Sequence, residues 1–419
     1  MDRETAVDVV VVGTGIAGGA LSAAIASEGF SVVALERSTE YKDRVRGEFI
    51  APWGVAEAQR LGLFQLLLAA GANVMNRMYG YDEVFSTEEA QRRAVALDAL
   101  VEGVPGALGI GHPAACAAIA SAAQASGARI IRGVADVAVE PGVKPVVRYT
   151  LAADTGGRNV HEVPCRIVIG ADGRDSAVRQ SVGMRLQATQ PRVFLGGLLV
   201  DGVGGWDSAC ALIGTEHDRM FYAFPQSASR SRLYLGVRAE ERQRLSGADR
   251  VATLLEGFQI SCLPSNVDIA SAVPVGPCAA YPMQDTWTDT PCADGVVLVG
   301  DAAGYSDPVI GQGLSIGLRD ARSVSEVLLA GDDWSTTAFR RYVQERAERM
   351  RRLRFAAQLF TDAHLPARPG ETHRRARMDL IGGGDERAFL AQVCTLTGPE
   401  TAPAGCFDPA VRSRLLAAV

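Results

Sequence analysis

A glycine-rich turn near the start of the chain is the first pattern that could carry chemistry. The segment Gly13-Thr14-Gly15-Ile16-Ala17-Gly18 follows a β-branched run, and Glu36 ends the next apolar run. In a strand–turn–helix setting Gly13 permits a tight turn, Gly15 lets the backbone approach a pyrophosphate, and Gly18 lets helix and strand pack closely. A carboxylate about twenty residues further on can accept hydrogen bonds from ribose hydroxyls. The pattern predicts dinucleotide binding, because a turn that only packs a helix on a strand leaves Glu36 unexplained.

Two more polar turns follow apolar runs later in the chain. Residues 170–179 read GADGRDSAVR, in which Asp172 by itself is typical of a turn. Residues 300–304 read GDAAG, and Pro308 and the segment Gly311-Gln312-Gly313-Leu314 follow them. Here Asp301 comes directly after a buried run, and a glycine-bounded loop leads into a helix. That arrangement would place a carboxylate against sugar hydroxyls and helix N–H groups against an electron-rich ring edge.

Composition and charge exclude several other classes. The chain has 419 residues, 47% of them hydrophobic, with 42 Lys and Arg against 48 Asp and Glu. This mild acidity argues against a nucleic-acid groove, so no nucleic-acid partner is expected. The eight cysteines form no CxxC pair, which predicts reduced thiols and no metal site. The first apolar run is too short for a signal peptide or a membrane span, and we expect a cytoplasmic protein without stable membrane association.

The elements that must position these turns differ between the two halves of the chain. The first part reads as a strand–helix–strand unit and the middle as an antiparallel sheet in a second layer. An arginine-studded helix is expected over 340–359, with its charges on one solvated face. Expected strands are 7–12, 31–35, 128–132, 146–152, 163–169, 193–200, 209–213, 220–224, 232–237 and 295–299; expected helices are 20–27, 53–70, 112–126, 313–329 and 386–393.

The order and spacing of the three motifs resemble those of the single-component FAD-dependent flavoprotein monooxygenases, the para-hydroxybenzoate hydroxylase-like family. The resemblance covers roughly residues 7–345. It implies an α/β fold with a Rossmann-like FAD-binding domain, a substrate domain built on a mixed or antiparallel sheet, and a C-terminal helical segment. We assign 1–75, 105–185 and 276–345 to the FAD-binding domain, 76–104 and 186–275 to the substrate-binding domain, and 346–419 to the C-terminal segment.

The resemblance also implies which residues hold FAD. The first motif would bind the ADP part, Asp301 the ribityl chain, and the loop from Pro308 to Gly313 the isoalloxazine, while residues 170–179 would serve FAD and the nicotinamide cofactor. The full set assigned to the cofactor is Gly13, Thr14, Gly15, Ile16, Ala17, Gly18, Glu36, Arg37, Arg46, Gly47, His112, Val137, Asp172, Asp301, Pro308, Gly311, Gln312, Gly313 and Leu314.

Three of these positions carry alternatives or departures. Arg46 resembles the family arginine that reaches the pyrophosphate, and a surface salt bridge is the alternative. His112 stands where the family usually has arginine or glutamine, and a helix-capping or core histidine is the alternative. Gly304 replaces the histidine that is common in this motif, which puts the packing of the loop in doubt more than the chemistry.

The reaction that the resemblance implies is oxygenation by the flavin itself. Transiently bound NADH or NADPH would reduce FAD, and the reduced flavin would react with O2 to give a C4a-hydroperoxide, so no catalytic side chain needs to be assigned. Alternation along 220–226 places Phe221, Ala223 and Pro225 on one strand face, which we take with Tyr234 as the substrate face. That face has no arginine. We therefore expect a neutral, aromatic or polycyclic substrate to be hydroxylated or epoxidised, as in natural-product tailoring.

Two other readings remain open. A flavin-dependent reductase of the geranylgeranyl-reductase type shares the fold and saturates double bonds without oxygenation. A non-catalytic flavin-binding protein is the other, and steady NAD(P)H turnover would exclude it. Flavin-dependent halogenases share these motifs but carry a WxWxIP element, which this chain lacks because its four tryptophans stand far apart.

Overall fold

The β-branched runs of the first part form a central mixed sheet that positions the three motifs; it is parallel from β21 through β12, β2 and β3 to β9 and antiparallel at β10 and β11. The computed structural model describes residues 2–45, 47–154, 159–365 and 370–417. In this sheet the strand order is β10-β11-β12-β2-β3-β9, and β21 pairs on the other side of β12. The bounds are β2 Val7–Val12, β3 Val32–Glu36, β9 Arg129–Arg132, β10 Val134–Glu140, β11 Val146–Leu151, β12 His161–Gly170 and β21 Val296–Leu298.

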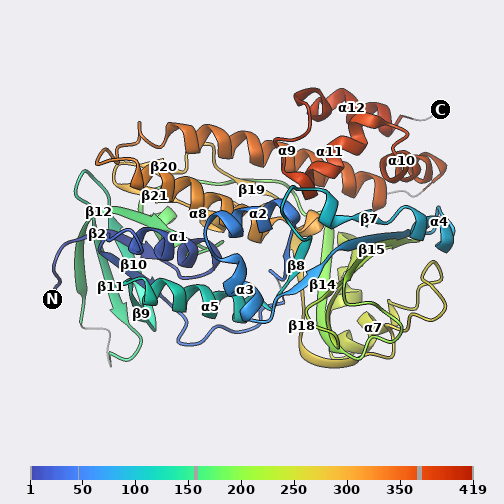
Figure 1. Ribbon diagram of the computed structural model, residues 1–419, viewed down its shortest axis with the longest axis horizontal. Helices are drawn as coiled ribbons and strands as arrows, with labels where there is room; N and C mark the ends of the chain where they lie inside the picture. Colours follow the sequence, from blue (N-terminus) through green and yellow to red (C-terminus); the bar gives the residue numbers. More distant parts are fainter. Residues whose placement is uncertain (1, 46, 155–158, 366–369, 418–419) are drawn as a thin grey trace.

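All three motifs begin where a parallel strand of this sheet ends. The strands β2, β12 and β21 lie side by side and end at Val12, Gly170 and Leu298. Ligands bind open α/β sheets at this carboxyl edge. Helices α1 (Ile16–Ala26), α5 (His112–Ala125) and α8 (Gly313–Leu329) pack together on one face of the sheet (Figure 1).

A second sheet of seven strands lies beside the first, in the order β18-β14-β17-β16-β15-β6-β7 (Figure 1). Most of its pairs are antiparallel, and β6 with β15 is the parallel exception among them. The expected boundary at 275/276 falls inside β18, which pairs with β14 along most of its length. The bounds are β6 Arg77–Asp82, β7 Val95–Ala96, β14 Val193–Asp201, β15 Cys210–Glu216, β16 Arg219–Pro225, β17 Arg230–Arg238 and β18 Val273–Met283.

Helices at the end of the chain lie over the second sheet near β7 and β15 (Figure 1). They are α9 (Arg340–His364), α10 (Glu371–Gly382), α11 (Glu386–Thr397) and α12 (Pro409–Leu415). Their apolar faces share one hydrophobic core with residues of the second sheet. In the part of the chain that the structure describes, no helix is both long and apolar enough to cross a membrane.

The smaller elements complete the frame around the motifs. The helix expected over 53–70 is two helices, because Gly62 adopts φ +70° between them. Short strands after the first motif form a separate three-stranded sheet in the order β4-β8-β5. The remaining bounds are β1 Asp2–Arg3, β4 Phe49–Ile50, α2 Pro52–Arg60, α3 Phe64–Ala69, β5 Asn73–Met75, α4 Thr87–Arg92, β8 Ala107–Gly109, α6 Ala177–Ser181, β13 Gln187–Ala188, α7 Arg250–Glu256, β19 Thr286–Trp287 and β20 Cys292–Ala293.

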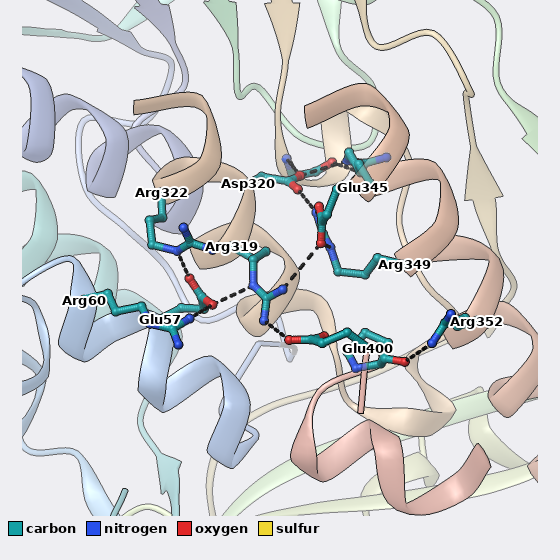
Figure 2. Close-up of polar contacts among 12 residues, drawn as sticks. Glu57, Arg60, Arg319, Asp320, Arg322, Glu345, Arg349, Arg352 and Glu400 are labelled. Carbon is teal, nitrogen blue, oxygen red and sulfur yellow. Dashed lines mark hydrogen bonds and ion pairs between the residues drawn. The ribbon is translucent and has the colours of Figure 1, made fainter. Parts of the chain in front are cut away.

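The expectation of one solvated arginine face on α9 is wrong. Arg346 and Arg349 are 1% and 3% exposed and both pair with Asp320 of α8, at 3.0 and 2.6 Å. Although burial opposes ionisation, these two arginines hold the pKa of Asp320 below its usual value. Figure 2 shows how this cluster continues through Arg319, which lies between Glu57 of α2 and Glu400. A buried carboxylate requires countercharges, and α9 supplies them.

Candidate functional site

One continuous cavity of about 980 Å³ borders all three motifs. It begins at the turn after β2, passes the loop between β21 and α8, and ends under the C-terminal helices. Both sheets and the C-terminal helices therefore contribute to a single site.

The three glycines of the first motif have different surroundings. Gly13 adopts φ +95°, and a Cβ built on it would lie 2.4 Å from the carbonyl oxygen of Ala171. A Cβ on Gly18 would lie 2.0 Å from the carbonyl oxygen of Gly13. Gly15 lines the cavity, and among the described atoms none lies within 4 Å of its ideal Cβ position. The first two glycines serve close packing, and Gly15 leaves open space at the N-terminus of α1.

Glu36 lines the cavity at the end of β3 and is 8% exposed. Its Oε2 accepts hydrogen bonds from the amide and the hydroxyl of Thr14, at 2.8 and 2.9 Å, and its Oε1 accepts one from the amide of Ser38 at 2.8 Å. Thr14 is fully buried, so its side chain holds Glu36 rather than the cavity's contents. Oε2 thus already accepts two hydrogen bonds, and Oε1 keeps a further lone pair for a ribose hydroxyl.

The second and third motifs are joined by arginines. Arg174 donates to Asp301 at 3.3 Å, and its guanidinium lies over the ring of Tyr305, 4.1 Å from the centroid. Arg179 donates to the carbonyl oxygen of Ala302 at 2.9 Å. From the other side, Arg346 donates to the carbonyl oxygens of residues 300, 303 and 304 at 2.9–3.1 Å. Asp301 thus borders the cavity on a backbone that buried arginines fix.

Asp172 has a different task from the one expected. It borders the cavity, but its Oδ2 accepts from the amides of Ala177 and Val178, at 2.7 and 3.2 Å, and its Oδ1 accepts from the hydroxyl of Ser176 at 2.5 Å. Ser176 in turn caps α6 by accepting from the amide of Arg179 at 3.0 Å. The carboxylate therefore accepts three hydrogen bonds at the start of α6, which leaves it less capacity to accept hydrogen bonds from a cofactor.

Gly304 shows why the family's usual histidine is absent. The residue adopts φ +106°, and a Cβ on it would lie 2.4 Å from the carbonyl oxygen of Thr286. The loop is thus packed directly against β19, with no room for a side chain.

The loop before α8 and the N-terminus of that helix, which carries a partial positive charge, line the cavity. Pro308, Gly311, Gln312, Gly313 and Leu314 all line it. Gln312 is held in place because its Oε1 accepts a hydrogen bond from the indole of Trp53 at 2.8 Å. The first amides of α8 lack partners within the helix, and with the helix dipole they favour negative charge there.

The remaining expected cofactor residues are distributed along the same cavity. Ile16, Ala17, Arg37, Gly47, His112 and Val137 all line it. Gly47 lies directly against the His112 ring, because a Cβ on it would be 2.8 Å from Cδ2. Arg46 lies outside the described residues.

The face of β16 that was expected to meet the substrate does not border this cavity along its middle. Tyr222 and Phe224 line the cavity, whereas Phe221 and Ala223 pack in a core on the other side of the sheet. The carbonyl of Pro225 packs against Gly109. The period-two alternation is as expected, but alternation alone does not tell which face meets the cavity. Tyr234 of β17 does line the cavity.

A buried polar cluster beside Tyr234 was not foreseen. The Tyr234 hydroxyl donates to Glu48, which is 2% exposed, and Arg232 lies 3.3 Å from the other carboxylate oxygen. Burial raises the pKa of the Glu48 carboxyl, with Arg232 opposing the shift. A signal was present: Arg232 interrupts an apolar strand two residues before Tyr234, on the same strand face.

The C-terminal helices also contribute to the cavity, which the sequence did not indicate. Phe360 and His364 of α9 line it, as do Phe389, Gln392 and Leu396 of α11. His364 contacts Thr215 of β15 and lies 3.7 Å from Asp82 of β6, so the end of the cavity away from the first motif is bordered by both the second sheet and the C-terminal helices.

Comparison with known proteins agrees with this geometry. A family model described as "FAD binding domain" matches residues 6–355. The 3-demethoxyubiquinol 3-hydroxylase of Escherichia coli is 24% identical over 369 residues, which are 81% of this chain and 85% of that protein. Digeranylgeranylglycerophospholipid reductase 1 of Methanopyrus kandleri is 30% identical over 204 residues, 46% of this chain and 51% of the reductase. The matched region thus spans about half the length of that reductase.

A solved structure supports the fold. The p-nitrophenol 4-monooxygenase PnpA of Pseudomonas putida DLL-E4 superposes with a TM-score of 0.77 at 18% identity, covering 95% of this chain and 99% of that one. The open space at Gly15, the carboxylates of Glu36 and Asp301, and the start of α8 match the donors and acceptors that FAD requires. The chain therefore belongs to the FAD binding domain family, as its resemblance to the single-component flavoprotein monooxygenases implies, and FAD is its cofactor.

Proposed function

We propose that this protein is an FAD-dependent monooxygenase that uses NAD(P)H and O2 to hydroxylate or epoxidise a neutral, aromatic or polycyclic small molecule. The observation that carries the proposal is the single cavity that joins the FAD-binding motifs to a chamber walled by aromatic side chains. Such a chamber suits a flat apolar molecule held next to the cofactor.

The walls of the chamber favour a neutral ligand. Leu195, Tyr222, Phe224, Tyr234 and Tyr281 contribute to it from the second sheet, and none carries a positive charge. Arg232, two residues before Tyr234 on the same strand, is paired with Asp43 and Glu48 and is 1% exposed. A ligand carboxylate would therefore find its countercharge already used.

The chain's own residues have three tasks in this reaction. Bound FAD, once reduced, supplies the reactivity toward O2. The amides at the start of α8 stabilise negative charge at the ring edge, and the enclosing side chains keep water away. Glu48 fixes the Tyr234 hydroxyl at the chamber wall by accepting its proton, so the oxygen of this hydroxyl is a positioned hydrogen-bond acceptor for a substrate.

The test is product analysis with ¹⁸O2. Neutral polycyclic phenols and alkenes, together with compounds made by enzymes of neighbouring genes, are incubated with the holoenzyme and NADPH or NADH. We expect one labelled oxygen atom in the product and NAD(P)H oxidation that requires FAD. A product whose added oxygen comes from water, or a product without added oxygen, would contradict the proposal.

A second candidate is a flavin-dependent reductase, favoured by the 30% identity to the Methanopyrus kandleri reductase. The two functions differ in their need for oxygen. Conversion of an alkene to its saturated product with reduced FAD under strict anaerobiosis would select the reductase.

A further inference from the structure

The end of the cavity farthest from the first motif contains a polar pair that FAD binding does not explain. Asp82 ends β6 of the second sheet, and His364 ends α9 of the C-terminal helices; both line the cavity. They are 2% and 4% exposed. Two titratable side chains from distant parts of the chain thus meet at one wall.

His364 is fixed at one nitrogen and leaves the other unused. Its Nδ1 lies 2.6 Å from the Thr215 hydroxyl, and its ring stacks on Phe360 with centroids 3.9 Å apart. Its Nε2 is buried and has no hydrogen-bond partner among the described protein atoms. Burial, helped by Arg377, holds the pKa of His364 well below its ordinary value, so the ring is neutral.

Asp82 likewise has one polar atom held by the protein and one without a hydrogen-bond partner among the described protein atoms. Its Oδ1 accepts from the amide of Val84 at 3.0 Å and lies 3.5 Å from Nε of Arg377. Its Oδ2 is buried, has no hydrogen-bond partner within the described chain, and lies 3.7 Å from Nδ1 of His364, too far for a hydrogen bond. Burial raises the pKa of Asp82 to about 6, with Arg377 opposing the shift.

Buried polar atoms in native proteins are nearly always hydrogen-bonded, so two unpaired ones on one cavity wall call for a partner from outside the chain. A hydroxyl group fits best. Its one proton can be donated to Oδ2 of Asp82 while its oxygen accepts from the Nε2–H of His364, in the tautomer whose Nδ1 accepts from the Thr215 hydroxyl. A carboxylate would be repelled by ionised Asp82, and an apolar group would leave both atoms unpaired.

We propose that Asp82 and His364 form a specificity subsite that binds a hydroxyl group of the substrate at the end of the cavity away from the FAD-binding turn. The proposal rests on the proposed function for its substrate and narrows that substrate to an elongated, hydroxyl-bearing molecule. Binding at this subsite would fix which end of the molecule faces the flavin.

The test measures ligand binding and needs no turnover. The holoenzyme is titrated with estrone, its 3-methyl ether and 3-deoxyestrone, and binding is followed by the flavin difference spectrum and by calorimetry. These probes share a polycyclic frame and differ in one hydroxyl. We expect wild-type protein to bind estrone about tenfold more tightly than the deoxy compound, with the ether close to the latter, as one net hydrogen bond allows.

His364→Phe keeps the stack on Phe360 and removes Nε2, so the ratio of the two dissociation constants should fall to about one, since the hydrogen bond is gone. His364→Gln keeps a polar terminus and should retain part of the preference, which separates recognition from a loss of folding. His161→Phe is the matched control, because His161 also stacks on an aromatic ring, Tyr149, but in the other sheet. FAD content should be normal in all three variants.

Two outcomes would overturn the subsite: a preference that persists in His364→Phe, or a wild-type protein that binds none of the probes or all three equally. Failure of the proposed function is distinguishable from both. If the ¹⁸O2 experiment gives no labelled product while the hydroxyl preference is present and lost in His364→Phe, the subsite stands and the reaction is a different one.

Discussion

At the residue scale, the carboxylates that border the cavity differ in how much of their bonding capacity the protein itself uses. Asp172 accepts three hydrogen bonds at the start of α6, and Glu36 holds the first turn through Thr14 and Ser38. Asp301 has one partner, Arg174, and its side chain is 35% exposed toward the cavity. Among these carboxylates, Asp301 has the most capacity left for the cofactor.

Asp301→Ala should therefore weaken FAD binding with little effect on the fold. The lost contact is a charge-assisted hydrogen bond worth about 1.5–3 kcal/mol, so the dissociation constant of FAD should rise at least about tenfold. Quenching of flavin fluorescence measures it. Asp332→Ala is the control, since Asp332 is 98% exposed and is not among the described residues that line the cavity. Unchanged FAD occupancy in the Asp301 variant would refute this role.

At the scale of elements, α9 connects the third motif to the C-terminal helices. The single side chain of Arg346 contacts both Asp320 and three carbonyl groups of the loop at 300–304. The arginine cluster of Figure 2 extends the same connection to α2 through Glu57. Replacing one arginine of α9 should therefore disturb the loop at 300–304.

Arg346→Met should lower the free energy of unfolding by about 3–5 kcal/mol, because it leaves a buried carboxylate and buried carbonyls without their partner. FAD affinity should fall as well. Arg351→Met, on the same helix, removes an exposed pair with Glu348 and should cost less than about 1 kcal/mol. Urea unfolding of both holoproteins makes the comparison. Equal losses in the two variants would show that the buried cluster adds nothing to the free energy of unfolding beyond what an exposed pair adds.

The loop before α8 should make stability depend on pH. Burial, reinforced by Asp285, raises the pKa of Asp307 to about 7, and burial raises the pKa of Asp285 to about 6. Since the folded-state pKa of each lies above the unfolded value, folding holds these protons more tightly. The resulting stabilisation is present in acid and is lost as pH rises from about 4 through about 7.

Asp307→Asn should consequently stabilise the protein at pH 8 by more than about 1 kcal/mol relative to its effect at pH 5, because one pKa unit corresponds to about 1.4 kcal/mol. The amide oxygen can still accept from the amide of Val309. Asp333→Asn is a matched control: Asp333 makes the same contact two residues on, to Ser335, but on the surface. Melting temperatures at the two pH values test the sign, and a larger gain at pH 5 would contradict it.

The sequence predicts the elements whose signal is local and fails where the signal is tertiary. The turn after β2, the helix over 313–329 and the strands β14 to β17 of the second sheet follow from glycine placement and alternation, whereas β6, β7 and β18 were not expected. The inward face of α9 does not, because only the fold places Asp320 opposite Arg346. For the same reason, alternation in β16 defines two faces but leaves open that Tyr222, rather than Phe221, meets the cavity.

At the scale of the whole molecule, the site is assembled from three parts of the chain. The first sheet provides the turns that we propose hold FAD, the second provides the aromatic wall, and the C-terminal helices border the far end. Oxygen chemistry at a flavin requires exclusion of water, so this closure matters even though no residue of α11 belongs to a flavin motif.

Leu396→Gln and Leu390→Gln separate closure from stability. Both leucines belong to α11 and pack against the same core, but only Leu396 is among the described residues that line the cavity. With a compound that the wild-type enzyme oxygenates, the Leu396 variant should divert a several-fold larger share of NAD(P)H oxidation to hydrogen peroxide, because a polar group there admits water to the chamber. FAD content should stay normal in both.

Since Leu390→Gln disturbs the same core without reaching the cavity, it should lose thermal stability but keep its coupling. Peroxide and product measured against NAD(P)H consumed decide between the two, and equal uncoupling would mean that the C-terminal helices support the fold without sealing the site.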